Sequence, residues 1–154
     1  MMKRLTLSLV ILLYSLAGCS NSEHVMEIEH KEKAGSLFIQ KVENNTSTEE
    51  LTKVVQDQDQ IKEVLTKIEG LKVEKISSDK MMDKMKSTDT YMFVFSEGKE
   101  MEAGKAAPFA FHVLEDGTFL FPYSGFDAPQ EPLITVDKHE ERLDELKQLL
   151  GIKF

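Results

Sequence analysis

The 154-residue chain contains little cysteine and little positive charge, and it lacks the common catalytic motifs. Its one cysteine, Cys19, has no partner for a disulfide within the chain, so a packed core must provide the stability. There is no Cys-x-x-Cys pair, His-Glu-x-x-His helix, glycine-rich phosphate loop or Gly-x-Ser-x-Gly turn. The net charge is −8, from 19 Lys and Arg against 27 Asp and Glu. Because an acidic surface repels phosphate backbones, we expect no nucleic-acid partner.

The longest hydrophobic run lies at the start of the chain. Lys3 and Arg4 precede it, and residues 5–17 are apolar apart from two serines and a threonine. A helix of this length rises roughly 20 Å, which is short of the ~30 Å hydrocarbon core of a bilayer. The run is therefore typical of a cleaved signal segment rather than of a stable span.

The four residues that end this run, Leu16-Ala17-Gly18-Cys19, resemble the lipobox of bacterial lipoproteins at every motif position. In that family the cysteine thiol receives a diacylglyceryl group, and a signal peptidase cuts just before the cysteine. The resemblance implies cleavage between Gly18 and Cys19, and a lipid on Cys19 that holds the protein at the extracytoplasmic face of the cell membrane. Two acyl chains are enough for firm anchoring.

Cleavage before Cys19 would divide the chain into three parts. Residues 1–18 are predicted to be the signal peptide, 19–35 a lipidated polar tether, and 36–154 a single domain. The tether is expected to be solvated because it is mostly charged, with Val25, Met26 and Ile28 as its only sizeable apolar residues. Removing Lys3 and Arg4 makes the mature net charge −10, so we expect no basic patch to help the lipid.

Two stretches show the i, i+3, i+4, i+7 spacing of apolar residues that is typical of a helix with one buried face. These residues are Ile61, Val64, Leu65 and Ile68 in the first stretch, and Leu143, Leu146, Leu149 and Leu150 in the second. The first helix is expected to begin at Asp57 or Asp59, and the second at Asp137. Residues 77–89 favour a third, shorter helix that is capped by Ser78.

Strands are predicted over residues 36–42, 71–76 and 90–95, and residues 51–55 favour either a short strand or a helical turn. Residues 109–123 predict a hairpin around Asp116-Gly117, with a two-residue turn that places His112 opposite Phe121. The element order indicates an α+β fold, with a mainly antiparallel sheet and two principal helices packed on one face. It resembles small uncharacterised lipoproteins of Gram-positive bacteria, and this resemblance implies no particular site.

Few residues are candidates for chemistry, and none predicts an enzyme. His112 is a candidate ligand or base, although a histidine among aromatic strand residues more often packs in a core. Met81, Met82 and Met85 offer the thioethers that Cu(I) prefers, yet Met at i and i+4 is more often a packing face. The sequence therefore predicts no metal and no cofactor.

The loop over residues 123–129 is the best candidate for a contact surface. It carries Tyr123 and Phe126 among turn residues, and loops on a rigid scaffold often carry recognition. The alternative is that Phe126 folds back to cover a sheet edge. We expect a non-enzymatic interaction module with a protein or cell-wall partner. A small-ligand or metal-binding lipoprotein is the alternative, and a hydrolase with an unrecognised site is less favoured.

Overall fold

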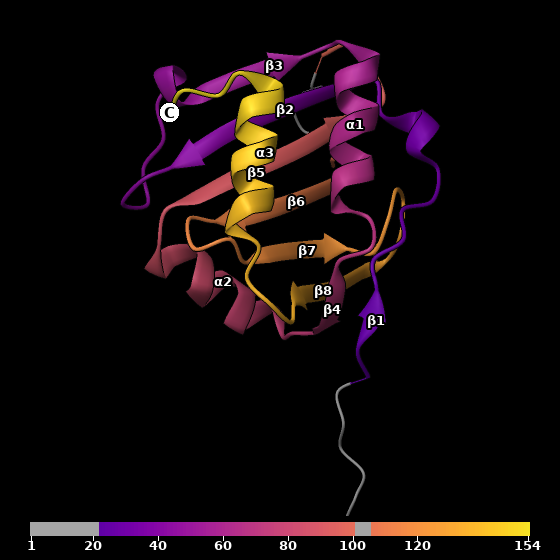
Figure 1. Ribbon diagram of the computed structural model, residues 1–154, viewed down its shortest axis with the longest axis vertical. Helices are drawn as coiled ribbons and strands as arrows, with labels where there is room; N and C mark the ends of the chain where they lie inside the picture. Colours follow the sequence, from indigo (N-terminus) through magenta and orange to yellow (C-terminus); the bar gives the residue numbers. More distant parts are fainter. Residues whose placement is uncertain (1–21, 101–105) are drawn as a thin grey trace, which may run out of the picture.

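The computed structural model describes residues 22–100 and 106–154, which form one eight-stranded sheet with helices on both sides (Figure 1). The predictions for the signal peptide, Gly18 and Cys19 lie outside these residues. The strands are β1 (His24–Val25), β2 (Ser36–Val42), β3 (Thr52–Val55), β4 (Lys72–Lys75), β5 (Thr90–Ser96), β6 (Phe109–Leu114), β7 (Phe119–Tyr123) and β8 (Gln130–Thr135). The helices are α1 (Gln58–Ile68), α2 (Ser78–Ser87) and α3 (Glu140–Leu150), with short 3₁₀ turns η2 (Lys31–Lys33) and η3 (Glu49–Leu51).

All strand pairs in the described sheet are antiparallel, in the order β1-β4-β8-β7-β6-β5-β2-β3. The predicted α+β class with a mainly antiparallel sheet is therefore confirmed. The strands β1 and β3 form its two edges, so the start of the described chain lies at one edge. Residues 49–55 form both of the predicted alternatives, a helical turn (η3) followed by a strand (β3).

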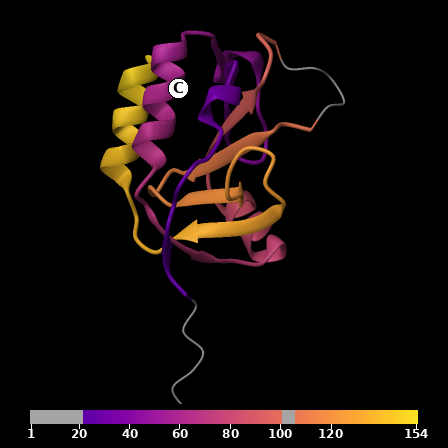
Figure 2. The same ribbon diagram turned by 90° about the vertical axis from the view of Figure 1, so that its right-hand side faces the viewer.

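The main core lies between the sheet and the pair of helices α1 and α3, which run side by side in Figure 2. Alternate residues of the central strands point to this face, because successive side chains in a strand alternate between faces. They include six fully buried phenylalanines: Phe93, Phe95, Phe109, Phe111, Phe119 and Phe121. The rings of Phe93 and Phe111 stack with their centroids 4.5 Å apart. Such ring pairs add about 0.5–1.5 kcal/mol to the burial of apolar area.

The opposite face of the sheet is covered in part by α2, which Figure 2 shows on the far side from α1 and α3. Buried Met81 of α2 packs against Leu114 of β6 and Leu120 of β7 in a second, smaller cluster. Half-buried Met85 and Ile134 complete this contact. The second cluster positions α2 beside the strands β4 and β8.

The helix starts show which of the predicted caps are used. The Asp57 carboxylate accepts the backbone N–H of Gln60 at 2.9 Å, so α1 begins after Asp57. Ser77, one residue before the predicted cap, caps α2. The prediction that Asp137 caps the last helix is wrong, because α3 begins after His139. The His139 N–H donates to the Gly117 carbonyl at 2.8 Å, so the segment before α3 is tied to the β6–β7 hairpin.

The predicted hairpin exists, but its register is wrong by one residue. His112 lies opposite Leu120 rather than Phe121. The Gly117 N–H donates to the Leu114 carbonyl, and Gly117 has a positive φ of 79°. This geometry is that of a three-residue loop with a glycine bulge, which adds one residue to the expected two-residue turn. The shift places His112 and Leu120 together on the α2 face of the sheet.

The prediction of a solvated tether is also wrong for residues 24–35, because this segment packs onto the domain. The Met26 N–H donates to the Leu71 carbonyl at 2.8 Å, and β1 pairs with β4. Met26 and Ile28 are only 2% and 4% exposed. Lys31 forms an ion pair with Glu69 at 2.6 Å. The two buried apolar side chains alternate with charged residues, so they occupy the core while their neighbours stay in water. The domain therefore begins near His24.

Candidate functional site

A cavity of about 330 Å³ lies at the adjoining ends of β5 and β6, beside the loop that follows β7. We call it the Tyr123 cavity. Its lining comes from three segments: Phe95, Ser96, Glu97 and Gly98; Ala106, Ala107 and Pro108; and Tyr123, Asp127 and Ala128. The volume is at the lower end of the range for small-molecule pockets, about 300–1,000 Å³. The cavity is large enough for one side chain or a small ligand.

The pairing of β5 with β6 builds one wall of the Tyr123 cavity. Phe95 lies opposite Phe109, which brings residues 95–98 next to residues 106–108. The apolar part of the lining is Phe95, Ala107 and Pro108, and the polar part is mainly Ser96, Glu97 and Asp127. A cavity with these walls suits an apolar group that also carries a hydrogen-bonding or cationic end.

The loop after β7 is held in place by two contacts of Asp127. The Asp127 N–H donates to the Pro108 carbonyl at 2.9 Å, and its carboxylate forms an ion pair with Lys33. The hydrogen bond that Lys33 donates to the Asp127 carboxylate holds the pKa of Lys33 above its usual range. Asp127 adopts a left-handed conformation (φ 55°), which Asp tolerates better than most residues. These contacts make the loop a defined wall of the cavity.

The two residues that were predicted to contact a partner have different environments. Phe126 is 4% exposed and packs between Phe95 and Phe109, at centroid distances of 5.8 and 5.1 Å. The prediction that Phe126 contacts a partner is therefore wrong. The structure has the alternative, in which Phe126 folds back over the sheet. Tyr123 is half-buried and lines the cavity, so its role in partner contact stays a prediction.

Sequence reasoning missed Glu97, Ala107 and Pro108 as parts of the same cavity. They are far from Tyr123 in the sequence, and no local pattern marks them. The only available signal was the pairing of the two predicted strands that flank them, which the structure has as β5 and β6.

His112 does not line the Tyr123 cavity. It lies on the α2 face of the sheet, opposite Met92 on β5, with 7% of its surface exposed. Its Nδ1 atom is buried and has no hydrogen-bond partner. Burial lowers the pKa of His112 to about 4, so the ring is neutral at physiological pH. No hydrogen bond or ion pair links its side chain to a carboxylate in the described residues, so nothing there equips it as a base.

The three methionines of α2 do not converge on one point. Met81 is buried against the sheet, Met85 is half-buried, and Met82 is 49% exposed. This distribution is that of a packing face with an exposed neighbour. In residues 22–100 and 106–154, no group of three or more His, Cys, Asp or Glu is placed to hold a metal ion.

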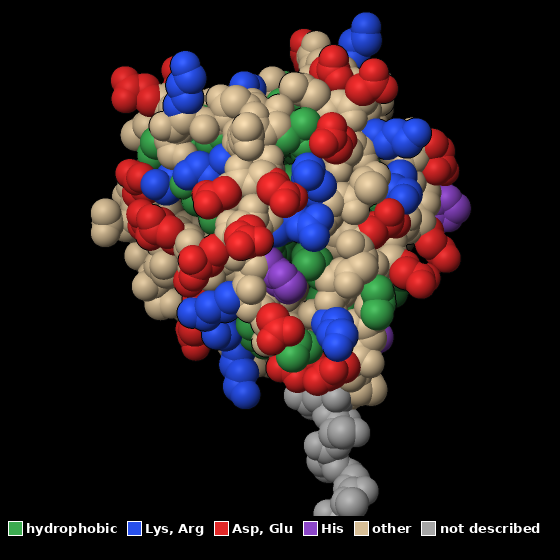
Figure 3. All heavy atoms as spheres, viewed as in Figure 1, with side chains coloured by type: hydrophobic (Ala, Val, Ile, Leu, Met, Phe, Trp, Pro, Cys, Tyr) green, Lys and Arg blue, Asp and Glu red, His purple; other side chains and the backbone are tan. Residues whose placement is uncertain are grey.

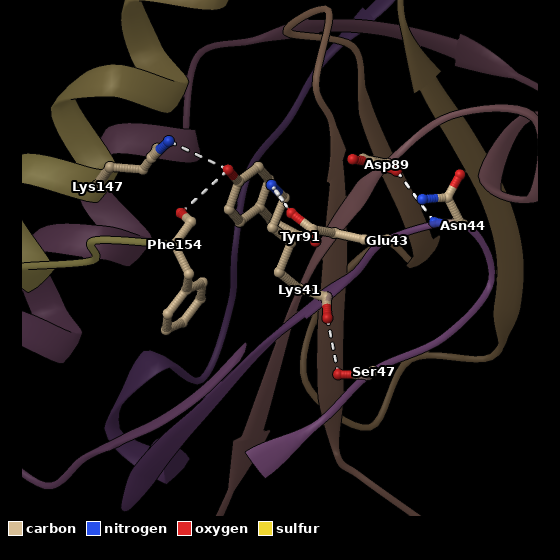
Figure 4. Close-up of polar contacts among 8 residues, drawn as sticks. All are labelled: Lys41, Glu43, Asn44, Ser47, Asp89, Tyr91, Lys147 and Phe154. Atoms are coloured by element: carbon tan, nitrogen blue, oxygen red, sulfur yellow. Dashed lines mark hydrogen bonds and ion pairs between the residues drawn. The ribbon is translucent and has the colours of Figure 1, made fainter. Parts of the chain in front are cut away.

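A second cluster of polar groups lies where α3 and the last residues meet β2 and β5 (Figure 4). The hydroxyl of buried Tyr91 accepts a hydrogen bond from Lys147 at 3.1 Å and donates one to the Phe154 carbonyl at 3.2 Å. The Lys41 ammonium lies 5.4 Å from the Tyr91 ring centre. Burial opposes the charge of Lys41, but its hydrogen bond to Glu43 leaves the pKa raised. Through the Tyr91 hydroxyl, the cluster binds Phe154 at the end of the chain to strand β5.

No family model matches the chain, and no curated protein or solved structure is significantly similar to it. In the part of the chain that the structure describes, no helix reaches the length and hydrophobicity needed to cross a membrane.

Proposed function

We propose that the protein is a bacterial lipoprotein, anchored through Cys19 at the extracytoplasmic face of the cell membrane, and that its domain is a non-enzymatic interaction module. The motif Leu16-Ala17-Gly18-Cys19, after a basic start and a short apolar run, supports the anchoring. The partner is a protein or a cell-wall component.

The Tyr123 cavity is the observation that carries the interaction part of the proposal. Its walls are held by strand pairing and by the contacts of Asp127, so it is formed before a partner arrives. A preformed cavity with an aromatic residue in its wall is a common anchor point for a partner's side chain, because little ordering entropy is lost on binding. Tyr123 supplies this aromatic residue.

The chemistry of the cavity favours binding over catalysis. Its serine hydroxyl, on Ser96, donates to the Glu100 carbonyl at 3.0 Å, and the Asp127 carboxylate is paired with Lys33. The one buried histidine with a strongly lowered pKa, His112, lies on another part of the sheet. Among the described residues, no hydrogen bond links the Ser96 hydroxyl to a histidine or a carboxylate, which is the pairing that activates a serine nucleophile.

The alternative function is the binding of a small ligand in the same cavity. The volume of about 330 Å³ favours this alternative, because it falls within the range of small-molecule pockets. A metal is a less suitable ligand, since the described residues hold no assembled set of His, Cys, Asp or Glu ligands.

Site-specific photo-crosslinking in cells tests the interaction module. We would replace Tyr123 with a photoreactive phenylalanine analogue and use the same replacement at Val54 as the control. Val54 is 57% exposed on the edge strand β3 and does not line the cavity. We expect one discrete crosslinked species from position 123 and none from position 54.

A cavity-filling variant tests whether either candidate function uses the Tyr123 cavity. Ala107→Leu adds bulk to the lining without removing a core side chain, and it should abolish the crosslink from position 123. The absence of any crosslink from position 123 in the unfilled protein would contradict the interaction module. Thermal stabilisation by a small molecule, lost in Ala107→Leu, would then favour the ligand-binding alternative.

A further inference from the structure

Exposed apolar side chains gather at the sheet edge formed by β1, β4 and β8. Four large hydrophobic side chains are exposed in the described residues: Val25, Val54, Met82 and Val136. Val25 pairs with Lys72, and the Val136 N–H donates to the Lys72 carbonyl at 3.0 Å, so these three residues form a row across the edge. Met82 lies on α2, which packs against β8 and the small cluster beside this edge.

Lysines surround the apolar side chains at this edge. A groove of about 570 Å³ lies between α2 and the strands β4 and β8. Its lining includes Val136, two carboxylates and four lysines: Glu74, Asp137, Lys75, Lys80, Lys84 and Lys138. Lys75 pairs with Glu131 and Lys138 with Asp116, whereas no ion pair joins Lys80 or Lys84 to another residue within the described ranges. We call Val25, Met82, Val136 and the four groove lysines the basal surface. The groove lining therefore has more lysines than carboxylates, although the protein as a whole is acidic.

The basal surface lies where the N-terminal chain enters the domain. Val25 lies on β1, the first strand of the described residues, and Figure 3 shows lysine, hydrophobic and acidic side chains together at the lower end of the domain. Only Ser20 to Glu23 separate Cys19 from β1, which begins at His24. Those residues reach at most roughly 17 Å when fully extended. A lipid on Cys19 would therefore hold the β1 edge of the sheet close to the bilayer.

We infer that the basal surface rests on the phospholipid headgroups of the membrane that holds the protein. The inference rests on the proposed lipid anchor at Cys19. Exposed valine and methionine side chains partition into the interfacial region, and lysines are attracted to anionic headgroup phosphates. The short connection to β1 presents this edge to the membrane. The opposite edge, β3, lies seven strand spacings from β1, about 34 Å along the sheet, and so would lie away from the membrane.

Fluorescence quenching by lipids tests this orientation on the full protein purified from membranes and placed in phosphatidylglycerol-containing nanodiscs. The variants Val136→Cys and Met82→Cys would each carry a thiol-reactive fluorophore, and the nanodiscs would contain a lipid with a headgroup quencher. Val54→Cys is the matched control, because Val54 is an exposed valine on the opposite edge. We expect several-fold stronger quenching at positions 136 and 82 than at position 54. Equal quenching at all three positions, or the strongest at position 54, would refute the orientation.

The contribution of the lysines is tested in the same nanodiscs. The double variant K80Q/K84Q should lower the ratio of docked to undocked domain by about 25-fold, because each lysine at an anionic surface changes such a ratio about fivefold. Lys62→Gln on α1, which does not line the groove, should leave the ratio unchanged. An equal effect of both changes would refute the assignment of Lys80 and Lys84 to the membrane contact.

The intact mass of each labelled preparation separates this inference from the proposed anchor. A diacylglyceryl mass and a single fluorophore show that Cys19 carries lipid, and the quenching pattern then reports on the orientation alone. A second fluorophore on Cys19 would refute the anchor. The difference in fluorescence quenching between positions 136 and 54, measured with added vesicles, would still show whether the basal surface binds lipid.

Discussion

Replacing His112 with leucine is expected to make the stability of the domain less sensitive to acid. The ring is buried on the α2 face of the sheet, and its Nδ1 has no partner. Burial holds its pKa at about 4, against 6.5 for an exposed histidine. The folded state therefore keeps the ring neutral, whereas the unfolded state takes up a proton as the pH falls through 6.5.

The sign and the size of the effect follow from these two values. Between pH 6.5 and pH 4 the unfolded state binds more protons, so acid shifts the equilibrium toward unfolding. The loss from His112 is about 2 kcal/mol at pH 5 and about 3 kcal/mol at pH 4, relative to pH 8. This is a large share of the 5–15 kcal/mol that is typical of a domain.

Urea unfolding, followed by circular dichroism at pH 8, 6 and 5, measures the effect. The difference in free energy of unfolding between wild type and His112→Leu should shift by about 2 kcal/mol from pH 8 to pH 5, in favour of the variant. Thr90→Val, a buried change on a neighbouring strand without a titratable group, should keep the wild-type pH dependence. An unchanged difference between wild type and His112→Leu across this range would refute the argument that burial holds the ring neutral.

Three further substitutions test the packing, each by urea unfolding at pH 8. Gly117→Ala is expected to cost about 2 kcal/mol or more, because φ is 79° and a Cβ would lie 2.4 Å from the first backbone nitrogen of α3. Phe126→Ala should cost about 3–5 kcal/mol, since it empties a buried site among aromatic rings. Tyr91→Phe should cost about 1–2 kcal/mol, because it removes the hydroxyl that bonds Lys147 and Phe154. A loss below about 0.5 kcal/mol, as for ordinary surface changes, would contradict the role assigned to that residue.

Local patterns in the sequence predicted the helices well. The spacing of Ile61, Val64, Leu65 and Ile68 repeats within one element, so it depends on no distant residue, and all four are buried. A cap depends on its surroundings as well. Asp57 caps α1 through its own side chain, whereas the start of α3 is decided by the hydrogen bond between His139 and Gly117. A contact between distant segments of this kind leaves no local pattern.

The errors at the hairpin and at the N-terminal segment have the same origin. The Asp116-Gly117 pair suits both a two-residue and a three-residue loop, and the bulge at Gly117 selects the second. Met26 and Ile28 lie among charged residues, so the segment has the composition of a solvated tether. It packs on the domain because β1 pairs with β4, which is far away in the sequence. In each case the structure depends on contacts that the short sequence pattern does not contain.

The Tyr123 cavity was predictable only in part. The turn residues around Tyr123 and Phe126 indicated a surface loop, but a loop pattern does not show which aromatic ring enters the core. Phe126 fills the space beside Phe95 and Phe109, and these come together only when β5 pairs with β6. The lining residues 95–98 and 106–108 also come together only through this pairing. The cavity therefore could not be predicted from the sequence alone.

Metabolic labelling with a clickable fatty acid tests the central claim, that Cys19 carries the lipid anchor. Wild type and the neighbouring control Ser20→Ala should both be labelled, processed and recovered with membranes. Cys19→Ala should lose the label and accumulate as a precursor that still contains residues 1–18, because the lipid acceptor and the cleavage signal are both removed. A Cys19→Ala protein that is still labelled and cut at the same bond would contradict the account.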